Sequence, residues 1–299
     1  MTYLPPSDPR AAAPGSSRDT VGAGERTAWL VPTAVLGGIG ALLLLGGGGA
    51  AMAASLSVEQ RTIDATVAEA VDTVVVDGHS AVVEVVTAEV PDLRVEAVYA
   101  GIGLDRAPEP RVQDGRLTVD ALPSGRWPGT GTGMQVTVTV PAGDEPVDLR
   151  LSSDAGTLRV DGDFGDVGVT TDAGVVQVSG SARSLSAVSQ VGTVLAEDVR
   201  VREELDVHTE FGATEVEVLG DAPRRSSVTT RTGAIEAALP EANYWRPTVA
   251  DADDRDPEEL TTATVCAAAP AERPCLYVSS AVGAVELTQG DRSPAAGGE

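Results

Sequence analysis

The two cysteines, Cys266 and Cys275, have the chemistry that is easiest to assign from the sequence. They are the only cysteines among 299 residues, and they flank the short segment AAAPAERP. Their spacing matches no zinc site, and two thiols alone would make a poor one. Outside the cytoplasm such a pair oxidises. We therefore predict a structural disulfide if the domain is exported, worth about 2–3 kcal/mol in the chain-entropy model.

Acidic residues suggest a second chemistry, the binding of Ca²⁺. Asp154 and Asp172 occupy the same position in two successive sequence repeats, and residues 251–259 read DADDRDPEE. Carboxylates stacked on neighbouring strands repel each other, and Ca²⁺ would relieve that repulsion. However, the acidic run lacks the EF-hand spacing with its fixed glycine and terminal glutamate. We predict solvated surface acids with no metal and no other cofactor, and keep Ca²⁺ as the alternative.

Side chains suited to catalysis are scarce. All 21 basic residues are Arg, so the chain has no Lys for a phosphate-binding loop, a Schiff base or a Ser–Lys pair. His79 lies in the sequence DGHS, which predicts a turn, and His208 falls on the outward side of its repeat. No G-x-S-x-G motif is present. We predict no catalytic residue and no enzymatic activity, with an envelope enzyme as a second alternative.

Three large aromatic residues fall in predicted loops: Trp127, Tyr244 and Trp245. Exposed aromatic side chains can anchor a protein partner or a sugar ring, so these three are the candidate interaction residues. The alternative is that they cap the end of the repeat stack, because an uncovered last strand leaves an exposed edge.

The overall charge excludes one class of partner. The formal net charge is -24 and aromatic residues make up only 3% of the chain. Nucleic-acid phosphates need cationic neutralisation, and single strands need aromatic stacking platforms. We therefore expect no nucleic-acid partner.

The N-terminal region predicts a membrane anchor. Residues 1–27 are rich in Pro, Gly, Ser and Ala and are predicted to form a disordered cytoplasmic tail. Residues 28–54 carry no charge and, as a helix, are long enough to span a bilayer. A cleaved signal peptide is the alternative, because residues 51–53 read A-M-A. Arginines precede the span, which favours a single-pass protein with its C-terminal domain outside the cytoplasm.

The middle of the chain is a repeat. Rows such as LSSDAGTLRV, VTTDAGVVQV and VTTRTGAIEA recur with glycine spacings of 18, 18, 20 and 21, and a sixth row follows after a gap of 50. Each row has a hydroxyl residue three positions before its glycine and apolar residues two and four positions after it, except that Thr214 stands two positions after Gly212. The glycines fit a sharp turn that needs positive φ. The row glycines are Gly156, Gly174, Gly192, Gly212, Gly233 and Gly283.

This period predicts an all-β fold, a β-solenoid or β-helix-like stack of about six rungs. Residues 58–150 alternate with period two and predict leading strands. Rungs follow at 151–240, an insertion at 241–276 and the last rung at 277–289, so the ectodomain spans 58–289. Residues 290–299 are predicted to form a disordered tail.

Strands up to VTVTVPAG, followed by rows of the form S/T-x-x-G-x-φ-x-φ, resemble the bacterial putative-adhesin β-strand-repeat family, a domain of unknown function. The resemblance covers residues 72–288, and the Arg-only, Ala/Gly/Val-rich composition looks actinobacterial. It implies an all-β domain on a membrane anchor at the cell envelope, with no known enzymatic activity. The expected function is therefore adhesion to, or interaction with, an envelope protein or glycan. A sensory or regulatory partner of a signalling system is the alternative.

Overall fold

The computed structural model describes residues 59–101, 109–120, 133–143, 145–246 and 266–290. The chain divides into two compact units, Met1–Leu56 and Ser57–Glu299, and only the second contains described residues. The predicted tail at 1–27, the predicted span 28–54, Trp127 and all of the predicted tail at 290–299 except Gly290 therefore lie outside the described part. Among the described residues there is no helix, and hence none that could cross a membrane.

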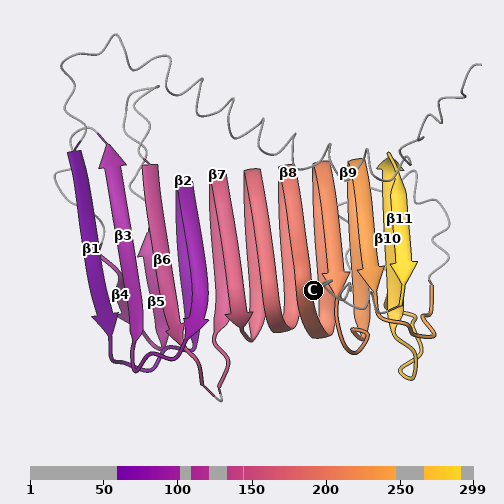
Figure 1. The fold of residues 1–299 in the computed structure, drawn as a ribbon, viewed down its shortest axis with the longest axis horizontal. Coiled ribbons are helices and arrows are strands. Elements are labelled where there is room, and N and C mark those ends of the chain that lie inside the picture. Colours follow the sequence, from indigo (N-terminus) through magenta and orange to yellow (C-terminus); the bar gives the residue numbers. More distant parts are fainter. Residues whose placement is uncertain (1–58, 102–108, 121–132, 144, 247–265, 291–299) are drawn as a thin grey trace, which may run out of the picture. The chain divides into compact units, whose positions relative to one another are not determined.

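The described part of the second unit is all-β, as the sequence predicts, and its strands join into one sheet (Figure 1). The order along the sheet is β1-β3-β6-β2-β7-β8-β9-β10; β11 pairs with β9, β5 with β2, and β4 with β5. The strands are β1 (Glu59–Val67), β2 (Thr73–Ala88), β3 (Leu93–Gly101), β4 (Arg111–Gln113), β5 (Arg116–Asp120), β6 (Gly133–Pro141), β7 (Asp148–Asp163), β8 (Asp166–Val218), β9 (Arg225–Leu239), β10 (Cys275–Val282) and β11 (Val285–Gln289).

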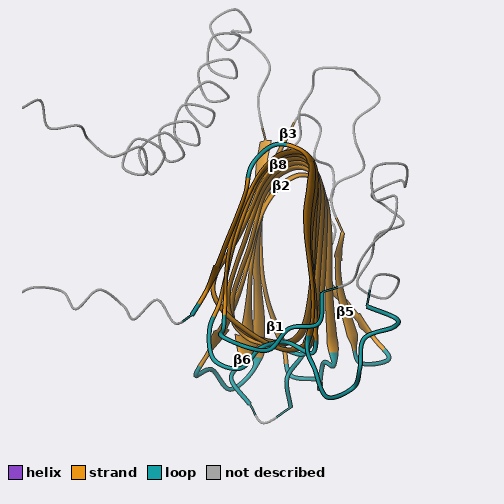
Figure 2. Cartoon of the chain, turned by 90° about the vertical axis from the view of Figure 1, so that its right-hand side faces the viewer, coloured by secondary structure: helices purple, strands orange, loops and turns teal. Residues whose placement is uncertain are grey.

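The pairing changes from antiparallel to parallel along the sheet. Strands β1, β3 and β6 pair antiparallel, whereas β2, β7, β8, β9 and β10 pair parallel to their neighbours. The parallel part follows the sequence rows in register, with Gly156 opposite Gly174 and Gly212 opposite Gly233. Seen end on, the strands curve over at one end and are joined by loops at the other, so each row has two facing limbs (Figure 2).

Strand β2 differs from its sequence prediction. The sequence predicts a turn at DGHS, residues 77–80, between two leading strands, yet this segment lies within β2. Asp77 and Gly78 pair with Ser152 and Ser153, so β2 follows the same path as the repeat rows. Ala81 takes the place of the row glycine, opposite Gly156. The rung was hidden in the sequence because it lacks the glycine that marks the others.

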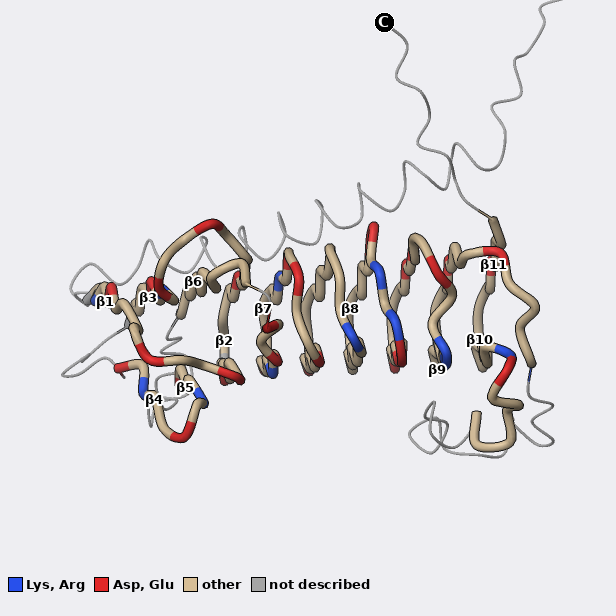
Figure 3. The backbone as a smooth tube through the Cα atoms, turned by 90° about the horizontal axis from the view of Figure 1, so that it is seen from below, with Lys and Arg blue, Asp and Glu red and all other residues tan. Residues whose placement is uncertain are grey.

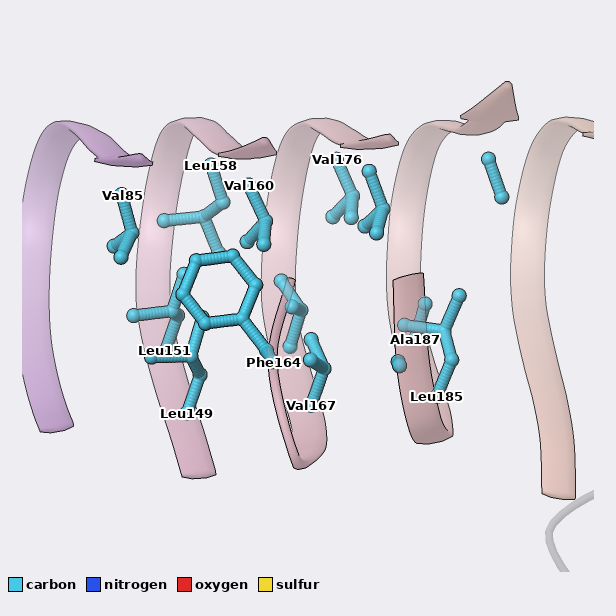
Figure 4. Packing of buried hydrophobic residues seen from close by; sticks show 14 of the residues in the cluster. Val85, Leu149, Leu151, Leu158, Val160, Phe164, Val167, Val176, Leu185 and Ala187 are labelled. Atoms are coloured by element: carbon cyan, nitrogen blue, oxygen red, sulfur yellow. The ribbon is translucent and has the colours of Figure 1, made fainter. Parts of the chain in front are cut away.

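The core is formed by the apolar positions that face inward from both limbs. Leu151 and Leu158 belong to the two limbs of one row and face each other across the interior (Figure 4). The column Leu158, Val176 and Val194 is fully buried, and Phe164 adds an aromatic ring. Alternate burial along β7 and β8 follows from the period of two in a strand with one dry face.

The glycine column has two physical requirements. All six row glycines have positive φ, between 140° at Gly156 and 151° at Gly233, a region that disfavours other residues. In addition, a Cβ built on Gly174 would lie 1.9 Å from the carbonyl oxygen of Gly156, and the same contact recurs up the stack. The sequence indicated the first requirement, and the structure adds the close approach of one rung to the next.

Hydroxyl side chains line the inside of the same bend. Ser153, Thr171 and Ser189 are buried in the column three positions before the glycines. The Ser153 hydroxyl donates a hydrogen bond to the carbonyl of Ala155 at 2.9 Å, and the Ser280 hydroxyl donates one to the carbonyl of Gly233 at 3.2 Å. The hydroxyls of Thr171, Ser189 and Thr230 in the same column are buried without a hydrogen-bond partner among the described residues, so these two bonds do not by themselves explain the preference for Ser and Thr at this position.

Candidate interaction surface

An uncharged ridge runs along the outside of the bend. The residues directly before and after each glycine lie where the chain turns the corner, so their side chains do not enter the core. We call these positions and the glycines between them the corner ridge. The residues before the glycines are Ala155, Ala173, Val191, Phe211, Thr232 and Val282. The residues after them are Thr157, Val175, Thr193, Ala213, Ala234 and Ala284.

The corner ridge contains most of the large exposed apolar side chains among the described residues. Val191 is 53% exposed, Phe211 45% and Val282 63%, and Val82 continues the ridge onto β2 at 49%. Phe211 and Val282 both pair with Thr232, so they lie on the two rungs that flank the Thr232 rung. The ridge is thus an uncharged strip on which large apolar side chains alternate with Ala and Thr. Exposed apolar side chains that gather on one surface are candidates for an interaction site.

Charged residues border the ridge, and several neutralise each other from rung to rung. Gln190 Nε2 donates a hydrogen bond to Asp172 Oδ1 at 2.7 Å, and Arg231 forms an ion pair with Glu210 at 3.2 Å. Because of the Gln190 bond, Asp172 meets an amide donor on the next rung. Figure 3 shows acidic positions along the whole row of strands, with several basic positions on β8 and β9.

The described residues add no support for the two alternatives from the sequence, Ca²⁺ binding and catalysis. Within the described ranges no group of three or more His, Cys, Asp or Glu residues could hold a metal ion, and residues 251–259 lie outside those ranges. His208 Nδ1 lies 2.9 Å from the hydroxyl of Thr229. That hydroxyl belongs to a residue only 4% exposed, so it cannot meet a substrate from solution.

The predicted disulfide between Cys266 and Cys275 is confirmed. Both cysteines are buried and pack with Tyr277, Trp245 and Ala269 in a small apolar cluster separate from the main core. Because Cys275 begins β10, the disulfide joins the last rung to the end of the insertion. Such a bond is expected only in an oxidising compartment.

Tyr244 and Trp245 occupy different environments, although both are candidate interaction residues. Tyr244 is 6% exposed and belongs to the main core, and its hydroxyl donates to the carbonyl of Pro240 at 3.0 Å. Burial raises the pKa of Tyr244 to about 12. Tyr244 therefore caps the core and is not open to a partner. Trp245 is half-buried against the disulfide cluster and remains partly accessible.

Arg273 holds the two ends of the insertion together, a role that the sequence did not indicate. Its guanidinium donates to the carbonyl of Asn243 at 3.1 Å, to Asn243 Oδ1 at 3.0 Å and to the carbonyl of Tyr244 at 2.7 Å. The main-chain N–H of Trp245 donates a hydrogen bond to the carbonyl of Pro274 at 2.7 Å, next to these Arg273 contacts. An open depression of about 780 Å³ adjoins it, with side chains of both charges in its wall. The only sequence cue is a lone Arg before Pro-Cys.

Comparison with known proteins adds two distant structural likenesses. No family model matches the sequence, and no curated protein sequence matches it. The chain is similar to a putative cell adhesion protein from Clostridium sporogenes, at 12% identity and a TM-score of 0.39, covering 78% of this chain and all 100% of the other. It is also similar to a putative adhesin from Bacteroides fragilis, at 11% identity and a TM-score of 0.38, covering 78% of this chain and 98% of the other. At these values neither likeness identifies a function.

Proposed function

We propose that the protein is a non-enzymatic, membrane-anchored protein of the cell envelope. Its β-repeat ectodomain, of β-solenoid type, serves as an adhesion or interaction surface. The observation that carries the proposal is the corner ridge, an exposed strip without charge on a chain whose formal net charge is -24. The Cys266–Cys275 disulfide supports placement outside the cytoplasm.

The ridge favours a partner that offers an apolar face, either an envelope protein or the CH face of a glycan. Phe211 supplies the aromatic ring that such faces pack against, and Val191 and Val282 extend the contact along the rungs. A strongly anionic partner would be repelled by the surrounding charge. This surface has no group suited to bond making or breaking, which is why binding is proposed rather than catalysis.

Binding of the purified full chain to isolated envelopes of the producing organism tests this function. The double variant Val191→Ser, Phe211→Ser removes apolar area from the ridge without touching the core. We expect about tenfold weaker binding with an unchanged melting temperature. Ser186→Ala, an exposed change on β8 away from the ridge, is the matched control and should bind like the parent. Equal binding by the double variant would remove the ridge from the proposal.

The anchor is tested separately. Deleting residues 28–54 should move the protein from the membrane fraction to the soluble fraction, because a span of that length holds a chain in the bilayer. N-terminal sequencing of the unaltered protein distinguishes the signal-peptide alternative. A mature chain that starts directly after residues 51–53 would show cleavage and contradict a permanent anchor.

A further inference from the structure

The two limbs of the last rung differ in how their outer edges are covered. On the β10 limb the insertion supplies a neighbour: Trp245 forms a parallel bridge with Cys275. Leu276 N–H donates to the carbonyl of Trp245 at 2.9 Å, on the side away from β9. Leu276 is only 2% exposed, and Tyr244 packs in the same core. This half of the rung is therefore closed by the chain itself.

The β11 limb has no comparable cover within the described ranges, where β11 pairs only with β9. Val285 occupies the inward column that is fully buried at Val194 and 2% exposed at Ile235, yet Val285 is 44% exposed. The next inward residue, Leu287, is half-buried, whereas its neighbour Ala237 is 1% exposed. Core-facing side chains at this end thus meet solvent.

Within the described ranges, no strand pairs with the backbone groups on the outer side of β11. Ile235 N–H donates to the carbonyl of Ala284, and Gly290 N–H donates to the carbonyl of Leu239. In a parallel ladder alternate residues bond to the same neighbour, so the even-numbered residues of β11 face β9. The amide and carbonyl groups of Val285, Leu287 and Gln289 consequently point away from the sheet, toward a missing strand.

The charge at this edge indicates what that strand must carry. Elsewhere, acids are matched by Arg on the next rung, as in Glu204–Arg225 at 2.9 Å and Glu210–Arg231 at 3.2 Å. At the edge, Glu286 is exposed on a strand that pairs only with β9 within the described ranges. Its carboxylate favours a cation on a strand that pairs with this edge, because opposite charges on neighbouring strands attract each other. A second copy would instead bring another formal net charge of -24.

We propose that β11 is a docking edge for one extended strand of another protein, which pairs parallel to β11 and places a basic residue between two apolar ones. The apolar residues would cover Val285 and Leu287, and the basic residue would lie beside Glu286. The parallel direction continues the stack and matches the bridge that Trp245 makes with Cys275. Strand addition of this kind gains affinity from main-chain hydrogen bonds and specificity from alternate side chains. It is independent of the corner ridge.

The specificity is tested with short peptides and the full chain in detergent, by fluorescence anisotropy. The probe acetyl-TVRVTV-amide should bind, and the same peptide with Glu in place of Arg should bind about fivefold more weakly or worse. The variant Glu286→Arg should reverse that preference. Equal affinity for the two peptides, or no binding of the Arg peptide to the parent, would overturn the proposal.

The edge itself is tested with two proline variants. Leu287→Pro removes an N–H that faces away from β9, so the peptide should no longer bind while the β9–β11 ladder remains. Glu286→Pro removes an N–H that bonds β9 and should also lower the melting temperature. The ridge variant Val191→Ser, Phe211→Ser should keep full peptide binding, which separates this proposal from the ridge function. Intact peptide binding by Leu287→Pro would show that β11 is not the strand site. If the parent self-associates in sedimentation and Leu287→Pro abolishes that association, the edge pairs with a second copy of this chain, which would also contradict the proposal.

Discussion

The regular rungs between residues 151 and 239 and the last rung between residues 275 and 289 are built from the same row pattern but held in different ways. The regular rungs lie between two neighbours, so the pairing of identical columns is enough to bury their inner faces. Within the described ranges the last rung has a full strand, β9, on one side and only the Trp245 bridge on the other. It is secured by a disulfide, an arginine clamp and a bridging tryptophan instead.

The difference shows how a repeat ends. Inside the stack, small residues suffice because each rung supplies the wall of the next, and a single glycine position fixes the bend. At the end the chain needs residues that occur nowhere in the rows, namely the cysteines and the Tyr244-Trp245 pair. Terminal units that differ from the repeat are the usual solution to an exposed last unit.

The largest expected effect is on the regular rungs. Gly174→Val forces positive φ on a β-branched residue and places its Cβ against the carbonyl of Gly156. Strain and overpacking together should lower the free energy of unfolding by about 3 kcal/mol, measured by urea unfolding.

Gly220→Val is the matched control for that substitution. Gly220 has φ of 81° but no atom near its Cβ position, so only the backbone strain applies. We expect a loss of about 1–2 kcal/mol. Equal losses in the two variants would mean that the close approach between rungs adds nothing.

The disulfide should matter for the last rung and little for the rest. Replacing both Cys266 and Cys275 by Ser removes a short covalent loop and should cost about 2–3 kcal/mol at the end of the stack. Amide exchange of β10 should accelerate in this variant, whereas that of β7 should not change. Uniform acceleration across both strands would show that the two regions unfold as one.

Alkaline pH should weaken the leading strands and the last rung through one buried tyrosine in each. Burial raises the pKa of Tyr99, in the leading strands, and of Tyr244, at the last rung, from 10.0 to about 12. A raised pKa in the fold favours the neutral phenol, so its stabilisation is complete below pH 10 and is lost as pH rises toward 12. The free energy of unfolding should fall by up to about 2 kcal/mol per tyrosine. Tyr244→Phe should make that fall shallower, and an unchanged pH profile would contradict the burial of its hydroxyl.

The arginine clamp should have the smallest effect. Arg273→Met removes three donated hydrogen bonds at a half-buried site and should cost about 1–2 kcal/mol, seen as faster exchange at Leu276. Arg246→Met, at an exposed arginine next to Trp245, is the control and should leave exchange unchanged.

The sequence could predict the parts of this fold that repeat. The columns of glycine, hydroxyl and apolar residues follow from the bend and the dry interior, so they predict the all-β class and the row register. The sequence did not predict that β2 follows the row path, because Ala81 stands in place of the row glycine. It did not predict the corner ridge either, because residues beside a bend have no sequence period that distinguishes them from inward-facing residues.

The candidate residues also differ in whether the local sequence could predict their role. The cysteine pair could be predicted from chemistry alone. The burial of Tyr244 and the hydrogen bonds of Arg273 depend on contacts between segments that are far apart in the sequence. Arg273 and Asn243, for example, are separated by 30 positions. No local pattern encodes such contacts, so the sequence left Tyr244 open between capping and binding, and Arg273 unnoticed.

Amide hydrogen exchange of the full chain, resolved by strand, tests most directly the claim that the stack is uniform inside and differs at its end. The account predicts slow exchange through β7, β8 and β9, intermediate exchange in β10 beside the disulfide, and the fastest exchange in β11, whose outer edge has no paired strand within the described ranges. Exchange in β11 as slow as in β8 would contradict the open edge, and fast exchange throughout β8 would contradict the in-register stack itself.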